Sequence, residues 1–373
     1  MNESLGAATL SLHVETGGFE ADLAFARNKA LNTLERMGRD ARLAGLVVSA
    51  AITAPIVGMA TLAIQSSTQF QTAFIGVTKT VEGTAIQYAN LRKEILQMAR
   101  EVPTAAKDIA DIAMVGGQLG IPIANLKEFT RVAIDLGSAT TLTAEQAITG
   151  ITRFMNIMGT APSRVRELAD ILVELGNNGA SSEKQILDFS LRMAGASHVL
   201  GLSEAQIMGF ANGLASLGGN AEASGSAFSR MSLEIFKAIT TDKAELDNFA
   251  GIAGVLPKTF ADMVRENPAN AILAFVRGLK SASDNGKDVI ALLKSVGITQ
   301  IRVLPEILKW ASGYATVAGS VQLATNKTQT NGASVNEATK RYASFASQFA
   351  LVKQRAQELA ITVGDDLVPA FLT

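Results

Sequence analysis

The chain has 373 residues and a formal net charge of −1, with 18% charged residues against 48% hydrophobic ones. This length is enough for about two or three domains with apolar cores, and the near-zero charge gives no reason to expect a specific nucleic-acid partner. Cysteine is absent, which excludes disulfides and thiolate metal sites and agrees with synthesis in a reducing compartment.

Residues 1–42 are the first predicted element, a short strand followed by a helix. Apolar and polar residues alternate at 10–14, which indicates a β-strand, and a pair of glycines ends it. The apolar residues at 19–37 then recur at helical spacing, so we expect a helix with one buried face there.

Residues 43–78 carry no charge, and their first part, 43–64, is long enough to cross a bilayer as a helix. Three arginines precede it, as a cytoplasmic flank would, and small residues spaced by four at 50–58 allow close helix approach. The segment is nevertheless rich in Ala, Thr, Ser and Gly, and we expect Pro55 to break it. We interpret it as a buried or multimer-packed helix pair. A resident transmembrane span and a segment that enters membranes conditionally are the alternatives.

Residues 79–240 are predicted to form helical hairpins. Thr84 and Gln87 have the spacing of a capping box at the start of the first helix, and Pro103 separates that helix from the next. A repeat then begins, in which Leu or Met precedes each glycine and the two glycines of a pair are 17 residues apart. The pairs are Gly120 and Gly137, Gly159 and Gly176, and Gly201 and Gly218.

Apolar residues lie at matching helical offsets between the paired glycines. They are Leu126, Phe129, Ala133 and Leu136, then Val165, Leu168, Leu172 and Leu175, then Ile207, Phe210, Leu214 and Leu217. Thr143 with Gln146, and Ser182 with Gln185, predict capping boxes at the helices that follow. Because glycine is the usual left-handed residue at a helix end, we expect these glycines to end helices. A hairpin cannot bury its stripe alone, so the hairpins must stack into an α-solenoid-like scaffold or binding surface.

A coiled-coil helix is predicted at 331–373, after an irregular helical region at 241–330 that prolines interrupt. Its apolar residues step by three and four over about four heptads, a pattern that favours pairing with another helix in the same chain or in another copy. We call these residues the seam. The seam consists of Val335, Ala338, Tyr342, Phe345, Phe349, Val352, Ala356, Leu359 and Val363.

Both ends of this helix are also predicted. Ser334 and Glu337 have the spacing of a capping box at its start, and Gly364 followed by two aspartates is expected to stop it. Because the sequence closes soon after a long helix, we expect the chain to be a fragment of a longer protein.

No catalytic, cofactor-binding or metal-ligating residue is predicted. His13 and His198 are far apart and lack carboxylates at ligand spacing. The glycine-rich residues 218–225 lack the lysine of a phosphate loop and indicate a turn, and Ser226 has no base in reach. Several carboxylates occupy predicted first turns of helices, where the macrodipole favours them: Glu145, Glu183 and Glu204. We therefore expect neither an enzyme nor a cofactor.

A register of helix ends and Leu-Gly turns agrees with one known family. The stretches that carry it include FQTAFIGVTKTV from Phe70, GGQLGIPIANLKEF from Gly116 and ELADILVELGNNG from Glu167. Upstream, ITAPIVG at 52–58 and GGFEADL at 17–23 fit the same pattern. Together they resemble the core region of tail tape measure proteins, minor tail proteins of long-tailed bacteriophages and prophages. The resemblance covers roughly residues 5–240.

The resemblance implies a structural role as the N-terminal part of a tape measure, without a catalytic motif. It implies a parallel multimer in the lumen of the tail tube that templates tube assembly and length and assists DNA delivery. The implied partners are further copies, tail tube and tail tip proteins and tail assembly chaperones, with conditional contact with the host membrane and no specific nucleic acid. The implied location is the virion, after synthesis in the host cytoplasm.

A second hypothesis is an α-solenoid adaptor, or a membrane-active helical protein, that binds a protein partner through a concave face. The seam and the uncharged residues 43–78 favour the tape measure, because self-association in a lumen accounts for both. Sedimentation distinguishes the two hypotheses, since a concentration-dependent trimer or hexamer favours the tape measure and a monomer favours the adaptor.

Overall fold

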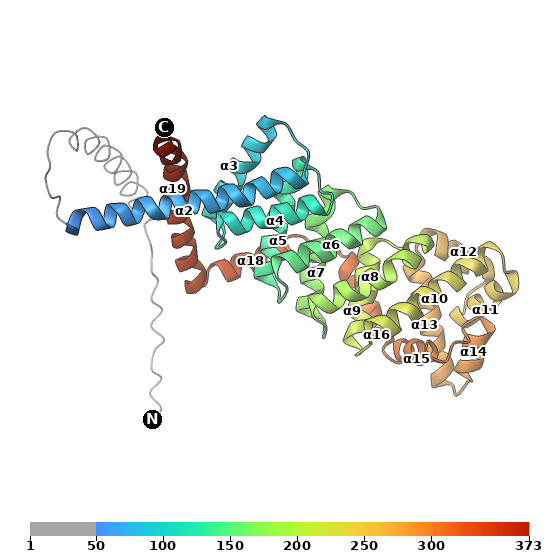
Figure 1. Cartoon of the computed structure of the whole chain (residues 1–373). Coiled ribbons are helices and arrows are strands. Elements are labelled where there is room, and N and C mark those ends of the chain that lie inside the picture. Colours follow the sequence, from blue (N-terminus) through green and yellow to red (C-terminus); the bar gives the residue numbers. More distant parts are fainter. Residues whose placement is uncertain (1–49, 373) are drawn as a thin grey trace, which may run out of the picture. The chain divides into compact units, whose positions relative to one another are not determined.

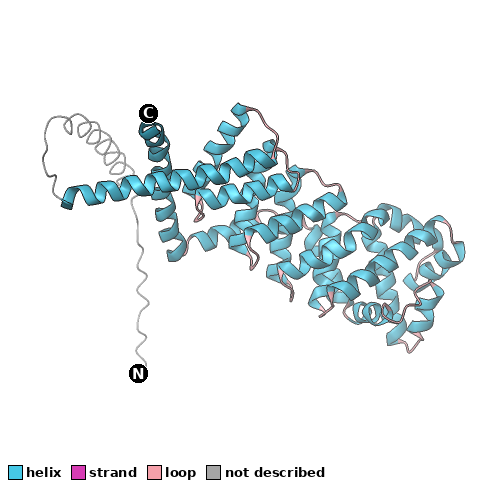
Figure 2. Cartoon of the chain, viewed as in Figure 1, coloured by secondary structure: helices cyan, strands magenta, loops and turns pink. Residues whose placement is uncertain are grey.

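The computed structural model describes residues 50–372, and it describes side chains from residue 63 to residue 365. The predicted strand at 10–14 and the predicted helix at 19–37 lie outside the described residues. The described part of the chain is built of helices and loops and contains no strand (Figure 2). The mainly helical class is therefore confirmed.

The helices are labelled as in Figure 1. They are α2 (Ala50–Thr80), α3 (Ala85–Glu101), α4 (Ala106–Gln118), α5 (Ile123–Ala139), α6 (Ala144–Met158), the 3-10 helix η1 (Pro162–Arg164), α7 (Val165–Asn178), α8 (Glu183–Leu200), α9 (Glu204–Ser216), α10 (Ala221–Thr240), α11 (Lys243–Ala253), α12 (Pro257–Glu266), α13 (Pro268–Asp284), α14 (Val289–Ser295), α15 (Leu304–Ser312), α16 (Tyr314–Thr325), α17 (Lys327–Thr330), α18 (Ala333–Tyr342) and α19 (Phe345–Leu372).

The chain divides into two compact units. Unit 1 takes the residues up to Thr68 and from Leu359 onward, and unit 2 takes Gln69–Glu358. In unit 1, α2 and α19 touch closely, because a Cβ on Gly364 would lie only 2.4 Å from the carbonyl oxygen of Ala63. The prediction that the helix stops at Gly364 is wrong: α19 continues to Leu372, and the glycine provides room for the neighbouring helix.

Unit 2 contains a stack of helical hairpins in two layers. The even layer consists of α4, α6, α8 and α10, and the odd layer consists of α3, α5, α7 and α9, with each helix packed on the next of its layer. In Figure 1 these helices follow one another in chain order from blue to yellow. Every predicted stripe residue of α5, α7 and α9 is buried except Leu217, which is half-buried. The predicted stacking is confirmed.

The predicted helix starts within the hairpin stack are also confirmed. Thr143 and Ser182 form complete capping boxes at α6 and α8, as Thr84 does at α3. A further box, formed by Ser203 and Gln206, begins α9. These local bonds fix where each hairpin begins.

The paired glycines have two different uses. Four of them have positive φ values of 85°, 67°, 88° and 71°, as a left-handed helix end requires: Gly120, Gly159, Gly201 and Gly218. For Gly137 and Gly176 the prediction is wrong, because both lie inside helices. A Cβ on Gly137 would lie 2.8 Å from the backbone nitrogen of Ala144, and one on Gly176 would lie 2.6 Å from a carboxylate oxygen of Glu183. These two glycines let the start of the next helix approach.

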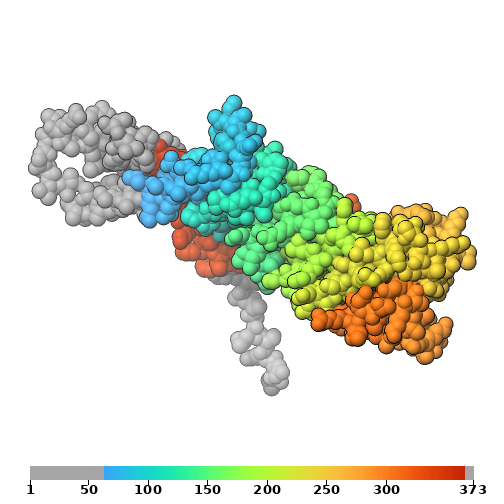
Figure 3. Space-filling model, turned by 45° about the vertical axis from the view of Figure 1, so that its right-hand side comes forward, coloured from blue at the N-terminus to red at the C-terminus, as the bar shows by residue number. Residues whose placement is uncertain are grey.

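Beyond α10 the chain reverses direction within unit 2. Helices α11–α14 pack against one another, and α15 packs on α10 and α13 (Figures 1 and 3). Helices α16, α17 and α18, which we call the return helices, then run back along the odd layer: α16 packs on α9, α17 on α7, and α18 on both α7 and α5. The return helices are thus a third layer of the unit.

Helix α16 approaches α9 through a face of small residues. A Cβ on Gly209 would lie 2.6 Å from a Cα atom of α16, and a Cβ on Gly213 would lie 2.7 Å from another. Between these glycines, Asn212 donates a hydrogen bond to Ser320 Oγ at 3.0 Å and accepts one from Ser181 at 2.6 Å. The buried amide is satisfied, and the two helices lie in close contact.

The C-terminal heptads do not form one uninterrupted helix. The structure has α18 and α19, separated by Ala343 and Ser344, which we call the hinge. The capping box predicted for Ser334 and Glu337 is also absent. The N-cap of α18 is Gly332, so Ser334 lies inside the helix. The predicted pairing of the seam with a second helix of another copy stays a prediction.

Helix α2 contradicts the expected break at Pro55. The proline lies in the second turn of α2, where its missing N–H removes one backbone hydrogen bond, and the helix continues to Thr80. Within residues 50–372 no helix has both the length and the apolar character needed to span a membrane.

Candidate functional site

The histidines and carboxylates that the sequence analysis considered do not gather into one site in the described residues. His198 is exposed in the last turn of α8, and His13 lies outside the described residues. The predicted first-turn carboxylates are in place: Glu145 in α6, Glu183 in α8 and Glu204 in α9. Glu204 accepts hydrogen bonds from Thr160 at 2.6 Å and Arg164 at 2.7 Å. Across the described residues, no group of three or more His, Cys, Asp or Glu side chains is placed to hold a metal.

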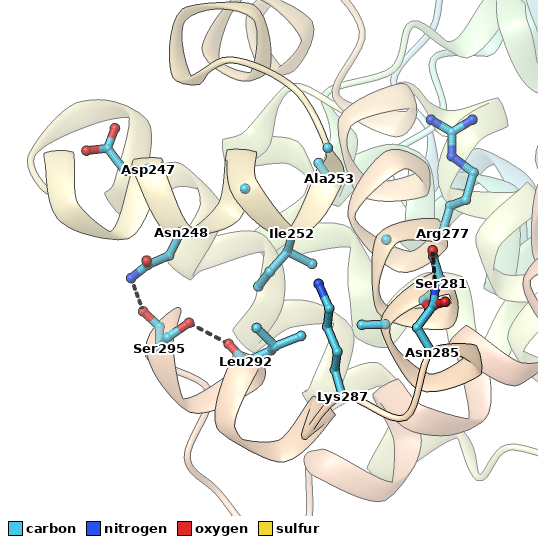
Figure 4. Close-up of a pocket in the computed structure, with 14 residues that line it drawn as sticks. Asp247, Asn248, Ile252, Ala253, Arg277, Ser281, Asn285, Lys287, Leu292 and Ser295 are labelled. Carbon is cyan, nitrogen blue, oxygen red and sulfur yellow. Dashed lines mark hydrogen bonds between the residues drawn. The ribbon is translucent and has the colours of Figure 1, made fainter.

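A cavity of about 650 Å³ opens between α11, α13 and α14 (Figure 4). Lys287 points into it opposite Ile252, and Arg277 lies at its edge. The amide of Asn248 donates a hydrogen bond to the carbonyl oxygen of Ser295 at 2.8 Å, which ties α11 to the end of α14. The cavity is thus an opening between these three helices, lined by both polar and apolar residues.

A buried carboxylate caps the start of α18. Asp170 of α7 is 4% exposed, and it accepts hydrogen bonds from the backbone N–H groups of Gly332 at 2.9 Å and Ser334 at 3.0 Å. The Ser334 hydroxyl donates to the same carboxylate at 2.5 Å. The first N–H groups of a helix lack partners within it and carry partial positive charge. Asp170 therefore supplies from α7 the cap that α18 lacks.

A second buried carboxylate holds the end of α18. Asp135 of α5 is 2% exposed and lies 3.1 Å from Arg131 Nε and 2.7 Å from Arg166 Nη1. The phenol of Tyr342 donates a hydrogen bond to Asp135 at 3.1 Å. Burial and the neighbouring charge of Asp135 raise the pKa of Tyr342 well above its usual range. The cluster thus joins α5, α7 and α18 through charges that are paired inside unit 2.

A third polar contact fixes the middle of α19 within unit 2. Arg100, in the last turn of α3, makes two hydrogen bonds of 2.9 Å each to the carboxylate of Glu358, which is 5% exposed. Arg355 donates in turn to the carbonyl oxygen of Arg100 at 3.1 Å. Bidentate pairs of this kind set both position and orientation.

The seam is divided between covered and exposed residues. On α18, Ala338 is 1% exposed, because α18 lies on α5 and α7. On α19, Phe345 is 80%, Phe349 68% and Val352 43% exposed. Large apolar side chains in a row at heptad spacing are costly to leave in water, so this row is a candidate surface for association.

Comparison with known proteins identifies the family. Residues 92–297 match the family described as phage-related minor tail protein, which is more than half of the chain. The chain belongs to this family. It is also 27% identical over 199 residues to a probable tape measure protein of Halomonas phage phiHAP-1, covering 50% of this chain and 23% of that protein. The chain thus spans about a quarter of the length of this curated relative. No solved structure matches the chain.

The predicted resemblance to tail tape measure proteins is confirmed by these matches, and with it an association with the virion tail. In this tail protein the matched residues begin within α3 and end just after α14, so they include most of the hairpin stack. The return helices and α19 lie beyond the matched residues.

The two carboxylates that hold α18 on α5 and α7 in this tail protein were not predicted from the sequence. Asp135 and Asp170 were not distinguished from the scattered surface charges. The available signal was local: each is an aspartate between apolar residues, in VAIDLG and LADILV, on a helix whose neighbouring positions are buried. A charge in such a position needs a partner. The identity of that partner, more than 150 residues away in the case of Ser334, has no local signature.

Proposed function

We propose that the chain is the folded N-terminal part of a tape measure protein that occupies the lumen of the phage tail tube. The observation that carries the proposal is the family match, which falls on the hairpin stack of unit 2. The name of the relative in the Halomonas phage, a probable tape measure protein, supports the same role. In this role the protein is a scaffold and not an enzyme, and it needs no cofactor.

Parallel self-association is the second part of the proposal. Phe345, Phe349 and Val352 form an exposed apolar row on α19, and copies that lie side by side in a lumen would cover it. Tail tube subunits then polymerise around the bundle, so that tube length follows the length of the complete protein. Tail tip proteins and tail assembly chaperones are the other expected partners.

The proposal includes a role during infection. The bundle leaves the lumen when the tail opens, which clears the path for DNA, and the uncharged residues 43–78 make conditional contact with the host membrane. No specific nucleic acid is expected to bind, because the formal net charge is only −1.

The adaptor hypothesis is less well supported. An α-solenoid adaptor needs a free face of its stacked helices to receive a partner. In unit 2 the odd layer is covered by α16 on α9 and by α18 on α5 and α7, so the chain itself occupies that face. An adaptor would therefore have to bind its partner through another face, such as the even layer.

Protease protection in virions tests the lumen. A short epitope inserted at the exposed turn between Asn285 and Lys287 should leave the helices intact, since Gly286 already turns the chain there. In intact particles of the phage that encodes the chain, we expect the epitope to resist protease and to be cleaved once DNA release is triggered. The same epitope in the purified chain should be cleaved at once. Cleavage in intact particles, or absence of the chain from particles, would contradict the proposal.

Sedimentation of the purified chain tests self-association. The double substitution Phe345→Asp and Phe349→Asp puts charges in the row, where an unpaired buried charge costs several kcal/mol. We expect it to turn a concentration-dependent oligomer into a monomer. Ile301→Asp is the matched control, because Ile301 is 85% exposed and lies outside the seam. An oligomer that survives the double substitution would show that α19 does not mediate association.

A further inference from the structure

The segment α18 has two sets of interactions that exclude one another. In the structure, Ser334 donates to Asp170 and Tyr342 donates to Asp135, and both residues hold α18 on the odd layer. The sequence also gives Ser334 the spacing to form its own capping box with Glu337, and it gives Tyr342 a place in the seam. Neither of these latter interactions can form while α18 is docked. Both interactions would need a second arrangement of this segment.

The hinge departs from a helix at Ser344, which caps the start of α19. It contains no proline or glycine, and Ala343 has φ −72° and ψ −10°, already in the right-handed helical region. The N–H of Ser344 still bonds to the carbonyl oxygen of Arg341 at 3.1 Å. The carbonyl oxygen of Tyr342, which would accept an N–H in a continuous helix, is satisfied instead by the side chain of Gln348 at 2.7 Å. Rotation of the Ser344 backbone out of its N-cap conformation would join α18 and α19.

A continuous helix would unite the seam. Ala338 and Tyr342 lie just before the hinge, and Phe345 and Phe349 continue the same heptad register after it. The occupant that fits such a seam is a second copy of the same helix. In a parallel pair in register, the flanking positions place Arg341 and Arg355 opposite alanines, and no like charges meet.

We propose that α18 is a switch segment. Docked on Asp170 and Asp135, it keeps Ala338 and Tyr342 of the seam out of reach and disfavours association. Released, it straightens at the hinge into one helix with α19, and the completed seam pairs with a second copy of the chain. This inference rests on the self-association in the proposed function and adds a control to it, because association then requires undocking.

A matched pair of substitutions at the hinge tests the switch. Ser344→Ala and Ser344→Gly both remove the hydroxyl that accepts from the N–H of Ser347 at 3.3 Å. Ala favours a helix interior over Gly by a factor of about five, whereas Gly is the better residue at a helix N-cap. We expect the association constant of the Ala variant, measured by sedimentation, to exceed that of the Gly variant at least fivefold. Equal constants, or the reverse order, would overturn the switch.

Release of the cap provides the second test. Asp170→Asn removes the charge that holds the start of α18. Asp188→Asn is the control, because the side chain of Asp188 is 48% exposed and pairs with Lys184 of its own helix. In Asp170→Asn, hydrogen exchange in α18 should become faster and the association constant should rise. In Asp188→Asn, neither quantity should change. Faster exchange in α18 without stronger association would contradict the proposal.

The variant Phe345→Asp with Phe349→Asp separates this proposal from the one on which it rests. If it abolishes association while the substitutions at Ser344 and Asp170 have no effect, the multimer stands and the switch is wrong. If the oligomer survives the double substitution, α19 does not mediate association. The proposed association through α19 and the switch are then both wrong. We expect loss of association in this variant and a response at both other positions.

Discussion

Two return helices cover the same odd layer in different ways. Helix α16 lies against α9 where Gly209 and Gly213 allow close approach, and the buried amide of Asn212 on α9 is satisfied. Helix α18 is held on α5 and α7 by the buried carboxylates of Asp135 and Asp170. The first contact depends on shape, so we expect pH and salt to affect it little. The second depends on charge, so it can be weakened without repacking the unit.

This difference matters under the proposed function, in which the protein assembles and later rearranges. A close-packed contact such as that of α16 is lost only with the fold around it, because interiors are bistable rather than continuously deformable. A charged contact at a helix end can break while the layers below stay folded. We therefore expect α16 to belong to the permanent scaffold and α18 to its movable edge.

The largest effect is expected from Asp135→Ala. The substitution leaves Arg131 and Arg166 without their shared buried partner, and breaking a buried ion pair costs about 3 kcal/mol. We expect the free energy of unfolding, measured with urea, to fall by this amount and α18 to lose protection from hydrogen exchange. Asp284→Ala is the control, since Asp284 is exposed and pairs with Lys280 of its own helix. If the free energy of unfolding falls no further than in this control, the buried charges do not hold α18 on the odd layer.

The shape-based half is tested by two glycines that differ only in surroundings. A Cβ on Gly213 would lie 2.7 Å from the Cα of Val317, while a Cβ on Gly195 in α8 would meet nothing within 4 Å. Gly213→Ala should destabilise unit 2 by about 2 kcal/mol, because backbone atoms must move. Gly195→Ala should stabilise it by about 0.5 kcal/mol through helix propensity. Effects of the same sign in urea unfolding would contradict the close approach of α16.

These two contacts also mark the limit of what the sequence predicts. The capping box at Thr143 and the stripe beginning at Leu126 follow from residues a few positions apart, and both were predicted correctly. Gly176 was wrongly predicted as a left-handed helix end, because a glycine that admits a neighbour has the same local sequence as one that ends a helix. The hinge was missed because no residue in it breaks a helix, and its bend comes from contacts of α18 with distant helices.

The candidate surface was partly predictable for the same reason. Phe345 and Phe349 were recognised from their heptad spacing, and they are exposed on α19. Asp170 was not recognised, because its partners Gly332 and Ser334 come from a segment more than 160 residues later in the chain. Local periodicity predicts which face of a helix is apolar, whereas docking between distant helices depends on the packing of the whole unit.

A smaller effect, which depends on pH, is expected at Tyr342. Burial and the charge of Asp135 raise the pKa of this phenol, so the folded state keeps its proton where the unfolded chain loses it. The stability from this contact is complete below the ordinary tyrosine pKa of about 10 and is lost as the pH rises above it. Tyr342→Phe should cost about 1 kcal/mol at neutral pH and make unfolding less sensitive to pH above about 10. Identical alkaline profiles of the two proteins would contradict the contact with Asp135.

The smallest effect is expected at Glu167, a partly exposed carboxylate on the same helix as Asp170. Glu167 of α7 accepts a hydrogen bond from Arg164 at 2.9 Å, and that bond, with Lys327 of α17 further away, lowers its pKa. A lowered pKa contributes stability above the ordinary value of about 4.3 that is lost as the pH falls. Because about a third of its side chain is exposed, Glu167→Gln should cost under ~0.5 kcal/mol at neutral pH, and less at high salt.

Glu167 and Asp135 together decide whether burial sets the strength of the charged contacts. Both carboxylates face arginines, but the side chain of Asp135 is 3% exposed and that of Glu167 is 34% exposed. If burial governs, Asp135→Ala costs several times more than Glu167→Gln, and 1 M salt reduces only the smaller effect. Equal costs in urea unfolding at both ionic strengths would mean that α18 is held no more firmly than α17. The movable edge would then begin before α18, at the first return helix that depends on charge.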